Sequence, residues 1–184
     1  TAIGAMLTNI TNPSLGGNEF IDLDEATGQE TVLESSYDER DLSIYALGVG
    51  AGNDPLDATE LPMVYEGSNK GFKALASYAA LPQLSAMLEL AKSGEKLIPG
   101  LNYGFDRSLH GEQYTEIKQL FNPSAKLTHT YKLKQAFDKN PHAVVVIGVD
   151  TKDESGEVVA YNEMSVFVRD GGGWGGERGP SGDE

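Results

Sequence analysis

Three histidines are the first residues to consider as catalysts, because imidazole is the side chain that most readily exchanges a proton near neutral pH. They are His110, His129 and His142. None pairs with another at metal-ligand spacing, and the chain has no cysteine, so we expect neither a metal site nor a cysteine nucleophile. His129 lies among alternating polar residues and His142 follows a proline, which predicts that both are surface residues.

His110 is the histidine whose surroundings suggest a binding role. It directly precedes Gly111, and a glycine lets a ligand approach the backbone closely. The competing interpretation is a buried histidine that makes structural hydrogen bonds, and the residues alone favour it. The sequence therefore leaves both interpretations open.

Two charged residues stand in predicted turns. Glu66 lies between Tyr65 and Gly67, where its carboxylate can orient a ligand group or simply accept hydrogen bonds from turn amides. Lys139 precedes Asn140, and a lysine in a turn is usually solvated. Its ammonium group would bind a phosphate if one lay nearby, because it is a compact positive charge.

The composition excludes several classes of protein. The 184 residues include 14 basic and 28 acidic side chains, for a net charge of -14. A nucleic-acid binder needs clustered cations to displace counterions from phosphates, so this balance argues against nucleic-acid partners. The sequence contains no run of about 18 apolar residues, so no membrane span is predicted. The absence of cysteine suits a reducing compartment.

The order of predicted elements indicates an α+β fold. Residues 1–35 are acidic and weakly periodic, and we interpret them as an extended leader or linker. Ser36 or Asp38 can cap a helix that carries Leu42 and Ala46 on one apolar face. Residues 61–65 are predicted to form a short strand, and Pro82 suits the first turn of a later helix.

The second half of the chain predicts an antiparallel meander that curves around helical segments. Its period-two patterns mark four strands, at 113–120, 126–137, 143–151 and 158–168. The compact domain is expected to span 36–170. The glycine-rich residues 171–184 then form a linker, because glycines offer no side chains to pack.

Five short stretches, taken together, point to one family. They lie at 37–41, 45–50, 64–68, 109–114 and 167–176. In this order they resemble the enoyl-CoA hydratase 2 part of type 2 peroxisomal multifunctional enzymes, a MaoC-like family. The resemblance implies a hot-dog fold, a curved antiparallel sheet around a helix, and the matching stretches belong to the N-terminal of two fused repeats.

The resemblance implies the acyl-binding half of a (3R)-specific 2-enoyl-CoA hydratase of fatty-acid β-oxidation. The C-terminal repeat of the family carries Gly-Asp-x-Asn-Pro-x-His, which holds and activates water. This sequence lacks that motif, and the stretch from Tyr45 to Asp57, which includes Gly52-Asn53-Asp54-Pro55-Leu56, looks like a degenerate copy without the histidine. No catalytic residue, metal or cofactor is therefore expected in this chain. The implied partners are the second repeat of the same polypeptide and, through it, a dimer in the peroxisome.

The family's contacts carry over to five residues. His110 and Gly111 match positions near the thioester or pantetheine arm, and Lys139 matches a contact to CoA phosphate. Tyr45 and Glu66 match positions that support the site.

Two alternatives stay open at this point. One is a hot-dog acyl-CoA thioesterase with Glu66 or Asp54 as its base. The other is an acyl-CoA-binding module without catalytic activity.

Overall fold

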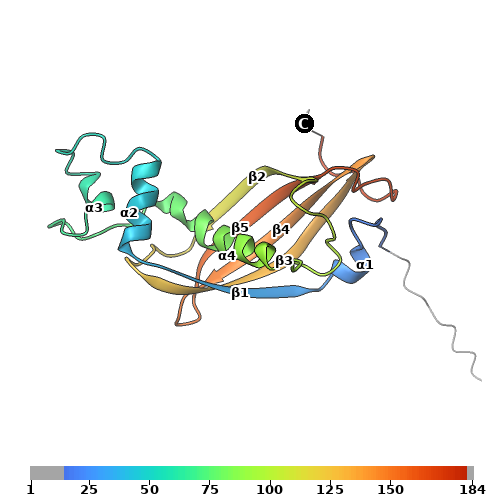
Figure 1. Ribbon diagram of the computed structural model, residues 1–184, viewed down its shortest axis with the longest axis horizontal. Coiled ribbons are helices and arrows are strands. Elements are labelled where there is room, and N and C mark those ends of the chain that lie inside the picture. Colours follow the sequence, from blue (N-terminus) through green and yellow to red (C-terminus); the bar gives the residue numbers. More distant parts are fainter. Residues whose placement is uncertain (1–14, 182–184) are drawn as a thin grey trace, which may run out of the picture.

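The computed structural model describes residues 15–181, which form a five-stranded antiparallel sheet curved around one long helix (Figure 1). This confirms the predicted α+β class. The strands are β1 (Glu30–Tyr37), β2 (Ser108–Ile117), β3 (Ala125–Lys139), β4 (His142–Lys152) and β5 (Val158–Val168). The helices are α1 (Leu23–Ala26), α2 (Glu39–Gly48), α3 (Leu61–Val64), α4 (Leu81–Lys92) and the 3₁₀ helix η1 (Ala76–Ala80).

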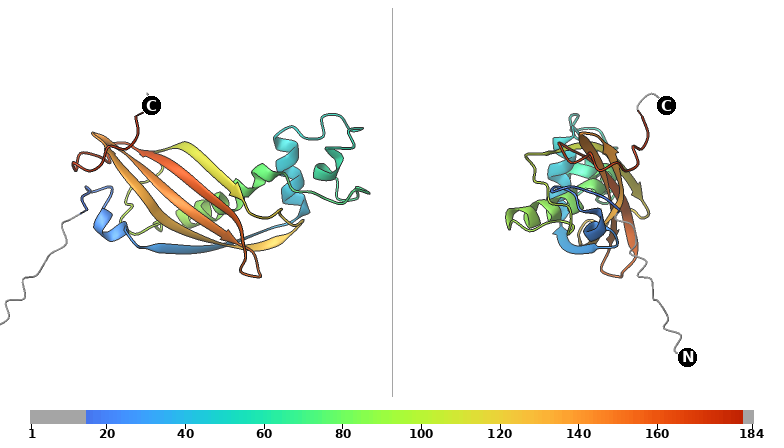
Figure 2. Two further views of the ribbon diagram at one scale, coloured as in Figure 1. Left: turned by 180° about the vertical axis from the view of Figure 1, so that it is seen from behind. Right: turned by 90° about the vertical axis from the view of Figure 1, so that its right-hand side faces the viewer.

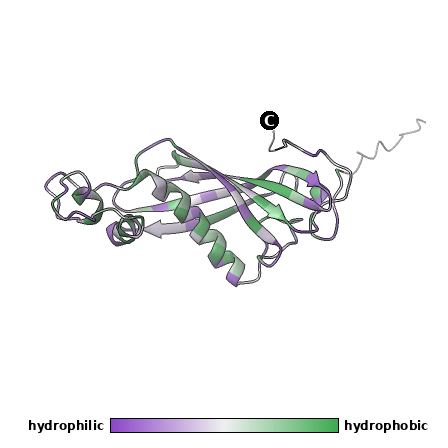
Figure 3. Ribbon diagram, turned by 90° about the horizontal axis from the view of Figure 1, so that it is seen from above, coloured by the Kyte–Doolittle hydropathy of each residue, from purple (hydrophilic) through white to green (hydrophobic). Residues whose placement is uncertain are grey.

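The molecule is elongated along the sheet. A lobe made of α2 and α3 lies at one end, whereas α1 and the C-terminal segment lie at the other (Figures 1 and 2). α4 crosses the concave face of the sheet, and Figure 3 shows hydrophobic residues along this helix and the strands beneath it. The two ends of the sheet are therefore different environments.

The strand order corrects the predicted meander at one strand. β3, β4 and β5 are consecutive neighbours as expected, but β2 pairs with β5 instead of β3. The physical reason is burial: β4 is a nearly continuous buried run and takes the central position, whereas β2 is largely exposed and suits an edge.

The predicted leader is wrong for its described part. β1 pairs with β3 along its full length, and Ile21 is completely buried beside Leu101. The acidic side chains of this region face solvent, so its sequence resembles that of a solvated linker although the segment belongs to the folded domain. Residues 1–14 of the predicted leader lie outside the described residues.

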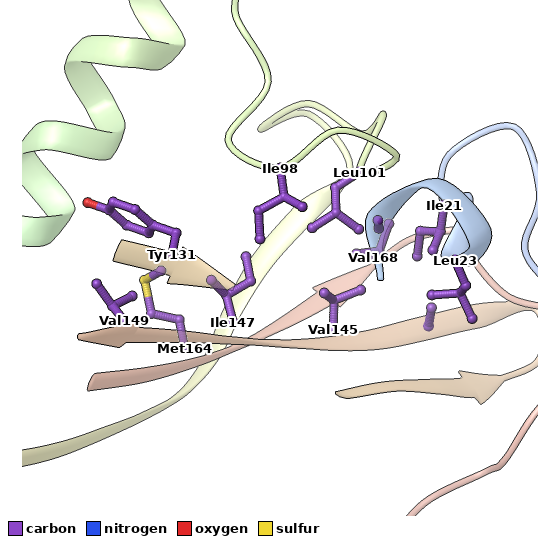
Figure 4. Packing of buried hydrophobic residues seen from close by; sticks show 12 residues of the cluster. Ile21, Leu23, Ile98, Leu101, Tyr131, Val145, Ile147, Val149, Met164 and Val168 are labelled. Carbon is purple, nitrogen blue, oxygen red and sulfur yellow. The ribbon is translucent and has the colours of Figure 1, made fainter. Parts of the chain in front are cut away.

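The main hydrophobic core fills the space between the concave sheet, α1 and the connection after α4 (Figure 4). The inward positions of the strands supply most of it, as period-two burial requires. Its labelled members are Ile21, Leu23, Ile98, Leu101, Tyr131, Val145, Ile147, Val149, Met164 and Val168. A smaller cluster joins α2 to the sheet through Tyr37, Leu42, Tyr78, Leu127 and Val159.

The helix predictions have mixed outcomes. The Asp38 side chain accepts hydrogen bonds from the Arg40 and Asp41 amides, so Asp38, and not Ser36, is the cap of α2. Pro82 lies in the first turn of α4, also as predicted. The strand predicted at 61–65 is wrong, because Leu61–Val64 form the short helix α3, with Pro62 in its first turn.

His129 is fully buried, so its predicted surface position is wrong. It belongs to the inward positions of β3, together with Tyr131. Its ring nitrogens lie 2.8 Å from the Ser35 hydroxyl and 3.0 Å from the Thr151 hydroxyl. Burial lowers its pKa to about 4, so the ring is neutral at physiological pH.

We expect His129 to make the fold sensitive to mild acid. The unfolded chain binds a proton there below its ordinary value of 6.5, whereas the folded chain resists protonation down to about 4. The stabilising contribution is therefore present above pH 6.5 and is lost as pH falls to 4, a total of about 3 kcal/mol. Urea unfolding of His129→Gln should show a flatter dependence of unfolding free energy on pH across this window.

The matched control is His142→Gln, which removes a half-exposed imidazole and should keep the steep dependence. If His129→Gln unfolds with the same pH dependence as the unmodified chain, buried His129 is not the titrating group.

Candidate functional site

An apolar cavity of about 260 Å³ lies between α4 and the concave face of the sheet. α4 forms one wall, the 94–105 connection another, and β4 and β5 the floor. The main lining residues are Met87, Leu90, Leu97, Tyr103, Ile147 and Val166. Polar atoms are a minor part of this surface, so the cavity suits a hydrocarbon chain.

The local sequence explains why this space is open. α4 presents the small side chain of Ala91, and the chain then turns at Gly94 with a φ of +79°. It returns over the sheet with Ile98 and Leu101 buried, which holds the connection away from α4. Gly100 has a φ of +86°, and a Cβ there would lie 2.5 Å from the Asp22 carbonyl oxygen, so this turn requires glycine.

His110 lies on the same sheet face as the cavity. It pairs with Val166 across the β2–β5 ladder, and opposed residues of an antiparallel pair project from one face. Val166 lines the cavity, as does Ser108 two residues before His110. The side chain of His110 is exposed, so the alternative of a buried structural histidine is wrong.

Gly111 lies in a bulge of β2, where the register with β5 shifts between His110 and Glu112. A Cβ at Gly111 would lie 3.3 Å from the Ser165 carbonyl oxygen. Bulges break a ladder locally and redirect neighbouring side chains, and they occur often near active sites. The bulge thus sets the direction of His110 relative to the rest of the strand.

A second, open cleft of about 910 Å³ lies on the convex face of the sheet. Gly111 and Lys139 both line it, so the structure brings these two predicted residues together. Phe137 and Phe167 form part of its apolar floor. His110 is not among its lining residues and projects from the opposite face.

The surroundings of Lys139 are unfavourable for an anion. Its Nζ donates a hydrogen bond to the Pro180 carbonyl oxygen at 2.6 Å. Three carboxylates, Glu112, Glu163 and Glu177, line the same cleft, although Lys134 forms an ion pair with Glu163. The negative charge of these carboxylates repels a phosphate, and this repulsion opposes the attraction that the Lys139 ammonium would exert on it.

Tyr45 belongs to α2 and Glu66 follows α3, so both lie in the helical lobe, and α2 and α3 are at one end of the sheet (Figure 1). His110 lies near the start of β2, opposite Val166 of β5. The Tyr45 ring packs against the Tyr78 ring with centroids 5.4 Å apart. Glu66 is exposed in the turn after α3. Asp54 is also exposed in this lobe, so neither candidate base of a thioesterase reaches the apolar cavity.

The described part of the predicted glycine linker, residues 171–181, packs on the domain. The Asp138 carboxylate accepts hydrogen bonds from the amides of Gly173 at 2.8 Å and Gly175 at 2.6 Å. Burial opposes the charge of Asp138, but these and neighbouring amides outweigh it and lower its pKa. Trp174 packs against the main core and anchors the segment, which the high glycine content did not predict.

The cavity residues at positions 97–105, within the 94–105 connection, were not predicted from the sequence. Leu97, Leu101, Tyr103 and Phe105 do carry a signal, because apolar residues recur at close spacing after the helix. This spacing matches neither a helix nor a regular strand, which explains the omission.

Two further properties concern the described residues 15–181. None of their helices combines the length and the hydropathy needed to cross a membrane. Their histidine and carboxylate side chains form no group of three that is able to hold a metal ion.

Comparison with known proteins agrees with this architecture. The chain is 35% identical over 150 residues to a peroxisomal hydratase-dehydrogenase-epimerase of Neurospora crassa, matching 80% of this chain and 16% of that protein. It is 38% identical over 148 residues to the mouse peroxisomal multifunctional enzyme type 2, matching 79% of this chain and 19% of the relative. The chain thus spans less than a fifth of the length of these relatives.

Solved structures and family models give the same result. A MaoC-like dehydratase from Phytophthora capsici superposes with a TM-score of 0.68 at 24% identity, over 88% of this chain and 54% of the other. This likeness confirms the predicted hot-dog fold. The model of the MFE-2 hydratase 2 N-terminal domain matches residues 35–170. The chain therefore belongs to the MFE-2 hydratase 2 N-terminal domain family.

Proposed function

We propose that this chain is the acyl-binding half of a (3R)-specific 2-enoyl-CoA hydratase of fatty-acid β-oxidation. The observation that carries the proposal is the apolar cavity beneath α4, with His110 on the same face of the sheet, in a member of this family. The acyl tail occupies the cavity. The thioester lies at its rim, within reach of His110, whose direction is set by the bulge at Gly111.

Catalysis in this proposal comes from the second hot-dog repeat of the same polypeptide. Hydration requires a base that activates water and an acid that protonates the α-carbon. Negative charge develops on the thioester oxygen, so fixed N–H donors lower the barrier. This sequence lacks the Gly-Asp-x-Asn-Pro-x-His motif that would supply the acid–base pair. The tail cavity and the catalytic groups are thus divided between two repeats.

The remaining predicted residues take secondary roles. Lys139 contacts a CoA phosphate only after its ammonium leaves the Pro180 carbonyl oxygen. The three carboxylates of its cleft make this the weakest of the proposed contacts. Neither Tyr45 nor Glu66 lines the cavity. Tyr45 supports the site indirectly, through the packing of its ring on Tyr78 in the helical lobe, and Glu66 supports it from the exposed turn after α3.

The assembly follows from the same proposal. The two repeats pack side by side, and two such units form a dimer. The relatives from Neurospora crassa and mouse are named peroxisomal, which supports a peroxisomal location for this chain.

The binding half of the proposal is tested with saturated acyl-CoA esters of increasing chain length. Each methylene buried in the cavity contributes about 0.8 kcal/mol, so the Kd should fall about fourfold for each added CH₂ until the cavity is full. Isothermal titration of the chain with butanoyl-, hexanoyl- and octanoyl-CoA measures this slope. A Kd that does not depend on chain length would contradict the tail cavity, and release of free CoA would indicate a thioesterase.

A further inference from the structure

We infer that the cavity selects acyl chains carrying an oxygen substituent in their distal part, and that the Tyr103 hydroxyl recognises that oxygen. The inference rests on the proposed acyl-binding function and names a narrower substrate class for the same cavity. The oxygen belongs to a hydroxyl, keto or ether group, each of which accepts a hydrogen bond from a phenol.

Tyr103 is held firmly at the cavity wall. The amide of the preceding residue, Asn102, donates to the Phe20 carbonyl oxygen at 2.8 Å, and the Leu101 amide donates to the Ile98 carbonyl oxygen at 3.0 Å. The Tyr103 ring packs against the main core cluster and lines the cavity. Its position is therefore set by the fold before any ligand enters.

The Tyr103 hydroxyl makes no hydrogen bond with any residue from 15 to 181. Two other tyrosines of the core differ, since Tyr37 donates to the Asn122 carbonyl oxygen and Tyr131 to the Gln83 carbonyl oxygen. Burial raises the pKa of Tyr103, so its hydroxyl keeps its proton and remains a donor. A polar group of this kind in a mostly apolar wall lacks a partner when a plain alkyl chain fills the cavity.

The rest of the lining makes this group distinctive. The other polar residues that line the cavity are Glu95, Lys96 and Ser108, which belong to the connection after α4 and to the start of β2. The residues contributed by α4, β4 and β5 are all apolar, among them Met87, Leu90 and Ile147. A plain chain gains from burial everywhere except at the phenol, whereas a chain with an oxygen at the matching carbon also satisfies the phenol.

The test compares octanoyl-CoA with octanoyl-CoA esters that carry one hydroxyl at successive distal carbons. For the unmodified chain, one position of the hydroxyl should bind about tenfold more tightly than the others. Tyr103→Phe keeps the ring and removes only the hydroxyl. It should lose that preference while binding octanoyl-CoA at least as well as before.

Tyr114→Phe is the matched control, because Tyr114 is exposed on β2 and does not line the cavity. Thermal unfolding of each variant verifies the fold. A Tyr103→Phe variant that keeps the positional preference, or weakens all esters equally, overturns the recognition role. Absence of any dependence on chain length in the unmodified chain instead overturns the proposed function itself, so the two failures are distinguishable.

Discussion

Joining this chain to a second hot-dog repeat that carries Gly-Asp-x-Asn-Pro-x-His is expected to turn on hydration of trans-2-octenoyl-CoA. The isolated chain should bind the ester without turnover, because its sequence lacks the motif that activates water. Acid–base catalysis and stabilisation of the developing oxyanion together account for a rate increase of about 10⁴-fold or more. Loss of absorbance of the conjugated enoyl thioester measures the rate.

Two controls define the division of labour. Substituting the Asp and His of the motif in the second repeat should return the linked protein to the rate of the isolated chain. Full hydratase activity of the isolated chain would contradict the division, because the catalytic groups would then lie within these 184 residues. The control matters because His110 lies on the same face of the sheet as the cavity, and imidazole is able to carry a proton near neutral pH.

The sheet was predictable wherever burial left a one-sided pattern. The inward residues of β3, β4 and β5 are mostly apolar, with His129 as an exception, and these strands were found within a few residues. β1 was missed because most of its side chains are polar and only Tyr37 is buried. An edge strand is stabilised by its ladder with a neighbour, which no local pattern records.

The candidate site was less predictable, for two physical reasons. Gly111 and Lys139 do share a cleft, but the sheet separates them from the face of His110, and strand parity alone does not assign a face across a bulge. The cavity arises where side-chain volume is missing, at Ala91 and Gly94. A cavity depends on how elements that are distant in the sequence pack around small side chains, and the sequence alone does not give that packing.

Filling the cavity from α4 should change the preferred chain length while leaving short esters almost unaffected. Ala91 lines the cavity, so Ala91→Phe places a ring where the distal methylenes of a long chain would lie. Exclusion of about four methylenes costs about 3 kcal/mol, which predicts about a 100-fold weaker Kd for decanoyl-CoA. Butanoyl-CoA should bind within about threefold of the unmodified chain, because its few carbons do not reach the ring.

The control for this variant is Leu88→Phe, which adds a ring to the more exposed side of the same helix, away from the main cavity. Phenylalanine costs a helix only about 0.5 kcal/mol relative to alanine, so both variants should remain folded. Equal weakening of decanoyl- and butanoyl-CoA by Ala91→Phe would show that the tail binds elsewhere. A selective loss of the long ester would instead locate the tail between α4 and the sheet, and the linked two-repeat protein should then show the same shift in its kcat/KM.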